Sequence, residues 1–255
     1  MFLGRKTEDE KPWFSATGFL ISVNNVLHLA TAKHVVVNME TGEELDKGMQ
    51  VFFNLKSRKI GSRSLDTLKR RLNVRWIFHE KPEVDVAVIP FTANPSKEDV
   101  AVISDEMFLS SRKLFELYDV FYLSYQPGLE QKRKISPLVR GGQISLIEPD
   151  KTFYIDGFAF PGNSGSPVFL RPSRWRFRGE EAVLGKDDLA FKFAGVIGEY
   201  LPYQEMAVSA QTGRPRVVFE ENTGLSRVWS GSFLRDIVAS DAFQRQCRSC
   251  RRIPA

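Results

Sequence analysis

The chain has 255 residues, 42% of them hydrophobic and 26% charged, which is typical of a soluble globular protein and excludes disorder over most of its length. No stretch approaches the roughly 20 apolar residues of a membrane-spanning helix, so we exclude that class and expect no membrane partner. The 36 basic and 31 acidic residues leave a net charge of +5, a mild excess that does not by itself indicate nucleic-acid binding.

The N-terminus and the cysteines both indicate a cytoplasmic protein. The first residues lack the apolar run of a secretory signal. The two cysteines, Cys247 and Cys250, stand near the end of the sequence, whereas a secreted domain of this size often carries disulfides in its body. One Cys-x-x-Cys pair supplies two of the four ligands of a structural zinc site. We therefore expect no metal, no cofactor and two free thiols.

Short apolar segments rich in β-branched and aromatic residues recur along the chain, each bounded by turn-forming or charged residues. They are the segments 18–23, 26–30, 51–55, 74–78, 86–89, 120–123, 143–147, 153–155, 168–170, 193–197 and 216–219. Many short strands separated by turn signals predict an all-β sandwich or barrel.

Helical patterns are few. Residues 64–72 predict a short helix, and residues 99–117 are ambiguous. The clearest helix is predicted over 232–243, where apolar residues form one stripe and Ser230 or Ser232 can serve as N-cap. The fold class expected from the residues alone is therefore all-β with a C-terminal helix.

Three segments carry residues that can do chemistry. His34 follows a predicted strand, where a lone histidine is more often structural than catalytic. Asp85 stands before an apolar strand, a usual place for a turn or capping residue. Ser164 lies between Gly162 and Gly165 in a turn before a strand, which suits an exposed nucleophile, a plain turn or an anion-binding nest.

Taken together, these segments resemble the chymotrypsin/trypsin-like serine protease family. Thr31-Ala-Lys-His34 is similar to the family's His motif, Asp85-Val-Ala-Val to its Asp motif, and Gly162-Asn-Ser164-Gly165 to its Ser motif, in the family's order. The variant is most similar to the bacterial HtrA-type protease domain without a PDZ domain. The resemblance implies two six-stranded antiparallel β-barrels. We expect an N-terminal arm (1–12), a first barrel (13–115), a second barrel (116–230), a C-terminal helix (231–246) and an Arg-rich tail (247–255).

The resemblance implies a role for each site residue. His34 is the general base, Asp85 orients it, Ser164 is the nucleophile, and the N–H groups of Gly162 and Ser164 form an oxyanion hole. It also implies substrate-binding residues at Phe158, six residues before Ser164, and along Val196-Ile197-Gly198. With Phe158 at the base of the primary pocket, we expect an apolar substrate residue before the scissile bond.

One position departs from the family pattern. Ser166 replaces a usual glycine. If that position needs a positive φ, serine strains the oxyanion loop.

These observations leave two functions open. The first is a serine endopeptidase that hydrolyses peptide bonds through an acyl-enzyme and acts on a restricted protein substrate. The alternative is a catalytically silent protease fold that binds a protein or nucleic acid. The long segments 40–75 and 171–190 suggest docking of a regulatory protein, and the basic segments 171–178 and 243–255 leave a nucleic-acid partner open.

Overall fold

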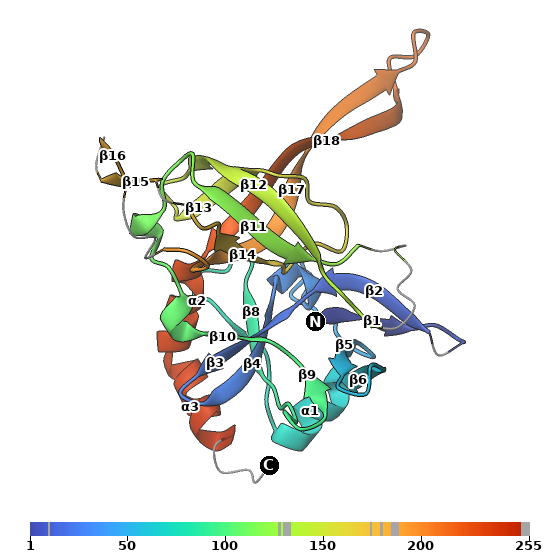
Figure 1. Cartoon of the computed structure of the whole chain (residues 1–255). Coiled ribbons are helices and arrows are strands. Elements are labelled where there is room, and N and C mark those ends of the chain that lie inside the picture. The colour runs from blue at the N-terminus through green and yellow to red at the C-terminus, as the bar shows by residue number, and fades with distance from the viewer. Residues whose placement is uncertain are drawn as a thin grey trace.

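The computed structural model describes residues 1–9, 11–126, 129, 134–173, 175–178, 181–184 and 189–250, without the side chains of 175–178 and 181–184. Its two β-rich halves lie one above the other in Figure 1. Residue 174 of the basic segment 171–178 and residues 251–255 of the tail lie outside the described residues. Within the described part, no helix combines the length and apolar character needed to cross a membrane.

The first half consists of two five-stranded sheets. One has the order β2 (Pro12–Thr17), β1 (Phe2–Lys6), β5 (Gln50–Leu55) and β6 (Ile60–Ser64), with β9 (Glu98–Asp99) also paired to β5. The other has the order β10 (Val102–Ser104), β3 (Phe19–Val23), β4 (Val26–Thr31), β8 (Ala87–Pro90) and β7 (Ile77–Phe78). Because β2 runs through Gly18 directly into β3, the sheets share one continuous corner.

The second half is a closed six-stranded barrel. Its strands follow the order β11 (Asp119–Ser124), β12 (Leu138–Ile147), β13 (Thr152–Asp156), β18 (Pro215–Ser230), β17 (Phe193–Val208) and β14 (Pro167–Leu170). A separate hairpin pairs β15 (Trp175–Arg178) with β16 (Glu181–Leu184). The predicted all-β, chymotrypsin-like fold class is confirmed, and one of the two expected six-stranded barrels is a closed barrel. The first half differs from the expected six antiparallel strands, because its strands pair as two five-stranded sheets and β10 runs parallel to β3.

The N-terminal arm predicted over residues 1–12 is wrong, because β1 is an internal strand of the first sheet. It pairs with β2 on one side and β5 on the other. Phe2 and Leu3 are buried, and the Phe2 ring stacks on Phe14 with 3.8 Å between ring centroids. Burial of Phe2 and Leu3 stabilises β1 and holds the first residues of the chain in the core.

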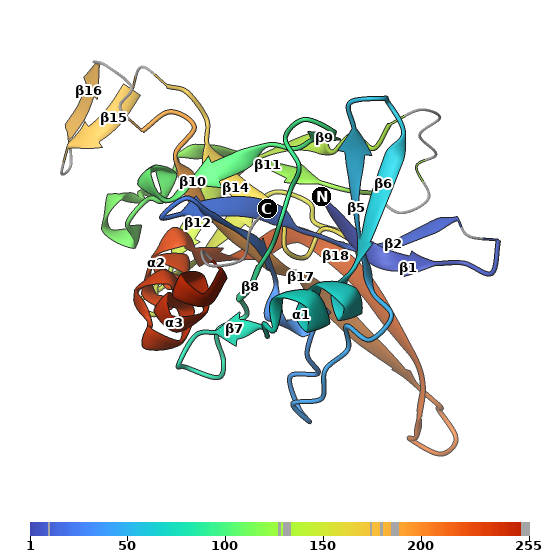
Figure 2. The ribbon, with the colours of Figure 1, turned by 90° about the horizontal axis from the view of Figure 1, so that it is seen from below.

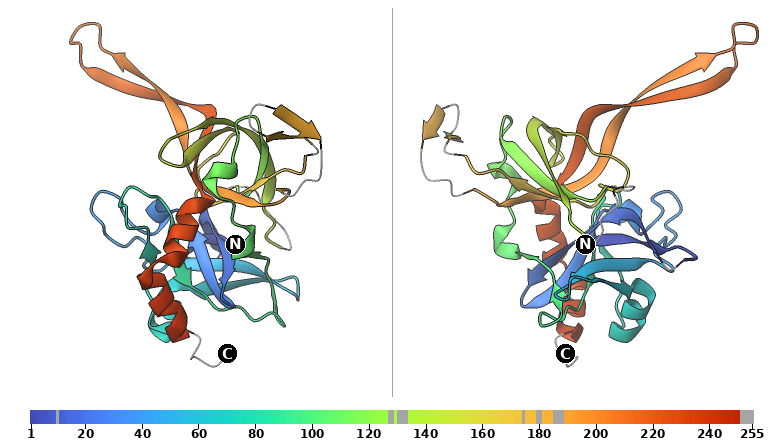
Figure 3. Two further views of the ribbon diagram at one scale, coloured as in Figure 1. Left: turned by 90° about the vertical axis from the view of Figure 1, so that its left-hand side faces the viewer. Right: turned by 45° about the vertical axis from the view of Figure 1, so that its right-hand side comes forward.

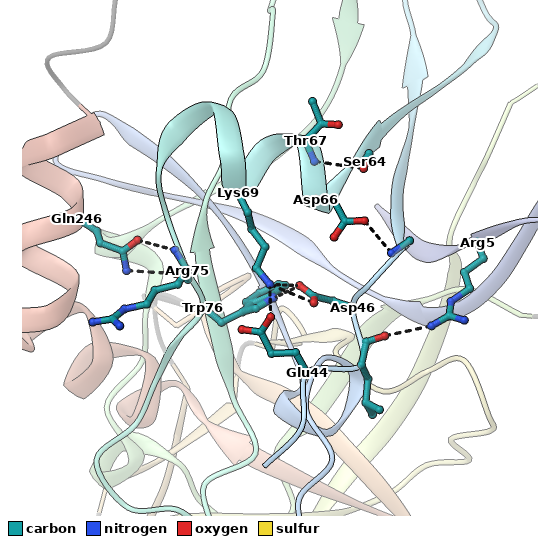
Figure 4. A network of polar contacts seen from close by, with 12 residues as sticks. Arg5, Glu44, Asp46, Ser64, Asp66, Thr67, Lys69, Arg75, Trp76 and Gln246 are labelled. Atoms are coloured by element: carbon teal, nitrogen blue, oxygen red, sulfur yellow. Dashed lines mark hydrogen bonds and ion pairs between the residues drawn. The ribbon is translucent and has the colours of Figure 1, made fainter. Parts of the chain in front are cut away.

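The segment 40–75 is mostly ordered structure, with β5, β6 and α1 (Leu65–Leu72), the short helix that the sequence predicts. Figure 4 shows the polar network that holds it. The buried Asp46 carboxylate accepts hydrogen bonds from the Trp76 indole (2.7 Å) and the Lys69 ammonium (3.1 Å). Lys69 also pairs with Glu44 at 2.7 Å. A buried carboxylate requires such partners, so this part of the segment is anchored to the fold.

The predicted C-terminal helix is present as two consecutive helices. α2 spans Gly231–Ala239, extended backbone at Ser240 ends it, and α3 spans Asp241–Cys250. The tail predicted from residue 247 is therefore wrong in its first four residues, because Cys247 is buried in the core and helical. Figure 3 shows both helices running from the second barrel along the first half, and Figure 2, seen from below, shows α2 and α3 together at one side of the molecule.

Helix α3 is fastened to the first half by a ring stack and a pair of hydrogen bonds. The Phe243 ring stacks on His28 of β4 with 4.4 Å between centroids. The Gln246 side chain bonds the backbone N–H and carbonyl of Arg75, at 3.0 and 3.2 Å. Helix α3 thus packs against the first half, although β18, the strand that precedes the two helices, belongs to the second half.

His28 makes this junction sensitive to pH. Its ring is fully buried, Nδ1 lies 3.1 Å from the Val26 carbonyl oxygen, and Nε2 has no partner in the described part of the chain. Burial lowers the pKa of His28 from 6.5 to about 4. Between these values the unfolded chain binds more protons, so stability falls as pH falls.

We predict that His28→Phe, which keeps the stack on Phe243, removes this loss. Between pH 7 and pH 4 the wild-type free energy of unfolding should fall by roughly 3 kcal/mol more than that of the variant. Urea denaturation at a series of pH values measures the difference. A constant difference between the two proteins at all pH values would show that His28 is not the titrating group.

Candidate active site

His34 and Asp85 form a doubly hydrogen-bonded pair. His34 lies in a single 3-10 turn, Lys33–Val35, directly after β4, and Asp85 precedes β8, which pairs with β4. The His34 Nδ1 atom is 2.7 Å from Asp85 Oδ2, and the His34 backbone N–H donates to Asp85 Oδ1 at 2.8 Å. Because a carboxylate only accepts, the ring proton belongs on Nδ1 and the Nε2 lone pair is left free to accept a proton.

The surroundings of His34 favour its protonated form. Burial by itself lowers the pKa of His34. The hydrogen bond and charge of Asp85, together with the charge of Glu199, more than offset that effect, so the pKa is raised above 6.5. His34 is therefore a stronger base than a free imidazole, and the imidazolium it forms is stabilised in place.

The Ser164 turn takes its shape from two glycines. Gly162 has φ +95° and Gly165 has φ +83°. Ser166 does not adopt a positive φ, so the strain expected at that position is absent. A Cβ at Gly165 would collide with the Thr17 carbonyl and the Thr31 hydroxyl. Glycine is thus required at 165, where the turn presses against the first half.

Asn163 holds the turn from inside. Its side chain is buried, its Nδ2 donates to the Tyr125 carbonyl at 2.8 Å, and its Oδ1 accepts from the Phe160 N–H at 2.9 Å. The Asn163 N–H donates back to the Phe160 carbonyl at 2.9 Å. These three bonds close the turn on itself and leave Ser164 at its half-buried outer edge.

Thr17 clamps the same turn from the first half, and sequence reasoning missed it. Its hydroxyl donates to the Gly162 carbonyl at 2.8 Å, and its backbone N–H donates to the Ser164 carbonyl at 3.0 Å. The N–H groups of Gly162 and Ser164 themselves donate no hydrogen bond within the described ranges. Thr17 thus bonds the carbonyls of both residues, whereas their N–H groups keep their capacity to donate, as an oxyanion hole requires.

His34 and Ser164 line one cleft of about 360 Å³, although no hydrogen bond joins them in the described part of the chain. Such bonds are often long before substrate binds. The cleft is also lined by Ala159, Phe160, Pro161, Ile197, Gly198, Glu199, Tyr200, Pro202 and Glu220. The arrangement brings a base and a hydroxyl to one cleft, with Gly162 two residues before Ser164 in the turn that forms part of its wall.

The predicted substrate-binding residues fall into two groups. Ile197 and Gly198 line the cleft. A Cβ at Gly198 would lie 2.7 Å from the Trp229 indole nitrogen and 3.3 Å from Asp85 Oδ2, so this close approach needs glycine. Val196 is fully buried, and Phe158 does not line the cleft: it is 52% exposed and stacks on Phe160. The motif spacing predicted the substrate pocket at Phe158, whereas the residues that follow it, Ala159 and Phe160, line the cleft.

Sequence reasoning also missed the acidic residues of the cleft, Glu199 and Glu220. Glu199 directly follows Gly198, so the predicted substrate-binding segment that ends at Gly198 could have indicated Glu199 as well. Glu220 comes from β18, and only the pairing of β18 with β17 brings it there.

The sequence of this chain matches the family model of the trypsin-like peptidase domain over residues 16–179, which is more than half of the chain and includes His34, Asp85 and Ser164. The chain belongs to the trypsin-like peptidase family. No protein of curated function matches it.

Among solved structures, this peptidase domain is similar to a serine endoprotease from Yersinia pestis, with 13% identity and a TM-score of 0.46. The match covers 95% of this chain and 61% of that protein's chain, so this chain spans about three fifths of the neighbour's length. At this TM-score the likeness supports no conclusion about the site.

We predict that Thr17→Val destabilises the peptidase domain, because it removes the hydroxyl that bonds the Gly162 carbonyl and accepts from the Tyr125 N–H at 3.3 Å. The loss of these buried partners should lower the free energy of unfolding by about 1–3 kcal/mol. Urea denaturation measures it. Thr17→Ser keeps the hydroxyl and is the control. An unchanged free energy of unfolding in Thr17→Val would contradict the stabilising role of the hydroxyl.

Proposed function

We propose that this trypsin-like peptidase domain is a serine endopeptidase that uses His34, Asp85 and Ser164 and acts on a restricted protein substrate. The observation that carries the proposal is the 2.7 Å bond between His34 Nδ1 and Asp85, with Ser164 in the same cleft. A serine hydroxyl needs a neighbouring base at neutral pH, and an imidazole held in one tautomer by a carboxylate meets that need.

The first half of the proposed reaction acylates the enzyme. His34 Nε2 takes the Ser164 proton while Ser164 Oγ bonds to the scissile carbonyl carbon. The negative charge that develops on the carbonyl oxygen is stabilised by the N–H groups of Gly162 and Ser164. The imidazolium then gives its proton to the leaving amine nitrogen, and the carbon–nitrogen bond breaks to leave an ester on Ser164.

The second half repeats these steps with water. His34 takes a proton from water, the hydroxide oxygen bonds to the ester carbonyl carbon, and the tetrahedral intermediate occupies the same pair of N–H groups. His34 returns the proton to Ser164 Oγ as the ester bond breaks, which releases the product as a carboxylic acid that loses its proton to solvent. Asp85 stays ionised throughout and keeps the ring in place.

The alternative of a catalytically silent binding module loses one of its reasons. A strained oxyanion loop at Ser166 would favour that alternative, and Ser166 has no positive φ. Two further proposals concern the cellular compartment and a protein partner. Cys247 and Cys250 are not joined in a disulfide, which supports a reducing, cytoplasmic compartment. The hairpin β15–β16, within 171–190, and the exposed parts of 40–75 are proposed surfaces for a regulatory protein.

We predict that a fluorophosphonate probe labels the wild-type chain at Ser164 and leaves Ser164→Ala unlabelled. Asp85→Asn should lower the labelling rate by about 10³–10⁴-fold, because the ring then adopts the wrong tautomer. Ser166→Ala, which removes a buried neighbouring hydroxyl, is the matched control and should label normally. Mass spectrometry of the labelled peptide locates the adduct. Labelling that persists in Ser164→Ala would refute the proposed nucleophile.

A second prediction concerns pH. Only neutral His34 can act as base, so peptide cleavage should rise with pH through its pKa, which is raised above 6.5. Glu199→Gln removes a charge that stabilises the imidazolium, so the acid limb of the kcat/KM profile should move to lower pH. Glu221→Gln should leave the profile in place, because Glu221 does not line the cleft. An unmoved profile in Glu199→Gln would exclude this electrostatic contribution.

A further inference from the structure

Two strands of the second barrel continue far beyond it. β17 and β18 have 16 residues each, and their pairing runs on from the barrel to Val208 and Pro215. Figures 1 and 3 show this part as a two-stranded ribbon that projects from the molecule. A lone two-stranded ribbon is only marginally stable in water, so a partner that covers it would add stability.

The register divides the ribbon into two faces. Directly paired residues share a face, and the pairs Pro202–Asn222, Gln204–Glu220 and Met206–Val218 lie on one side without an interrupting bulge. Pro202 and Glu220 line the cleft that holds His34 and Ser164. We call this side the cleft face. The outer face carries Tyr203, Glu205, Ala207, Val217, Phe219 and Glu221.

The cleft face begins with a fixed negative charge. Glu220 accepts hydrogen bonds from the Tyr200 hydroxyl (2.5 Å) and the Gln204 amide (2.9 Å), both neutral donors that orient the carboxylate without cancelling its charge. Glu199 adds a second carboxylate to the cleft. Neither lysine nor arginine is among the residues lining this cleft in the described part of the chain, and the nearest cation to Glu199, Arg227, is 3.8 Å away and bonds Asp150 at 3.2 Å.

Beyond Glu220 the same face becomes apolar. Met206 is 58% exposed and its cross-strand partner Val218 is 54% exposed. This pair lies about 7 Å further along the ribbon than the Gln204–Glu220 pair, which is also the distance between alternate residues of an extended peptide. An extended chain in the cleft can therefore place one side chain at Glu220 and its second neighbour over Met206.

We propose that the cleft face of the β17–β18 ribbon is an extension of the substrate site. Its occupant is an extended polypeptide that carries lysine or arginine at Glu220 and an apolar residue two positions further along, at Met206 and Val218. Two arguments select this occupant: the face is continuous with the cleft, and the cleft charge is negative. The inference rests on the proposed function for the identity of the cleft. It concerns a subsite separate from the primary pocket predicted at Phe158.

The test is peptide binding to the full-length chain with Ser164→Ala, which needs no turnover. The probes are fluorescent decapeptides of alanine and serine that carry one lysine and, two positions further, one leucine. The comparison peptides replace lysine with norleucine or leucine with serine. Fluorescence anisotropy gives each dissociation constant, and circular dichroism checks that every variant is folded.

We expect the lysine–leucine peptide to bind at least tenfold more tightly than either comparison peptide. Glu220→Gln should abolish the lysine preference and keep the leucine preference. The double variant Met206→Ser, Val218→Ser should do the reverse. Glu221→Gln and Val217→Ser change the outer face in the same ways and should leave both preferences intact, which makes them matched controls.

Three results would overturn the inference: no peptide binding, a lysine preference that survives Glu220→Gln, or equal losses in the outer-face variants. Equal losses accompanied by a change in molar mass would identify the ribbon as a contact between copies of the chain. A different experimental result would refute the proposed function. Missing probe labelling of the wild-type chain refutes the endopeptidase but leaves the binding preferences measurable, whereas labelling without these preferences refutes only the ribbon subsite.

Discussion

The site depends on one contact between the two halves, the seam where Thr17 meets the Ser164 turn. His34 and Asp85 belong to the first half and Ser164 to the second, so no local segment sets the distance between base and hydroxyl. The Thr17 hydroxyl and N–H bond the carbonyls of Gly162 and Ser164, and Gly165 lets the two backbones approach. Rotation of one half against the other would break these bonds, so packing of the two halves and geometry of the site are coupled.

Negative charge organises the chemistry around that seam. Asp85 stabilises protonated His34 through a direct hydrogen bond, and Glu199, which lines the same cleft, does so through its charge. Asp85 is buried by the folded chain, whereas Glu199 and Glu220 face the cleft. Glu199 thus favours the imidazolium and, together with Glu220, gives the cleft the negative charge that would attract a cationic substrate side chain, which links the basicity of the site to its selectivity.

Features carried by short local patterns could be predicted from the sequence. Many strands of both halves, among them β3, β4, β5, β8 and β17, together with helix α1 and the His34, Asp85 and Ser164 segments, each depend on a few neighbouring residues. Features set by distant residues could not. The Thr17 hydroxyl bonds the distant Gly162 carbonyl, Glu220 reaches the cleft through strand pairing, and β1 is a strand because β2 and β5 pair with it. No spacing rule along the chain encodes those contacts.

The placement of α3 bears on the order in which the protein folds during synthesis. Phe243 and Cys247 belong to the same buried cluster as Phe19, Ile21 and Val88 of the first half. When the first half has emerged from the ribosome, helix α3, which completes this cluster, has not yet been synthesised. The first half must therefore wait, with apolar surface exposed, until nearly the whole chain has emerged. Chaperone protection during translation would matter more for the N-terminal half of this protein than for the barrel made after it.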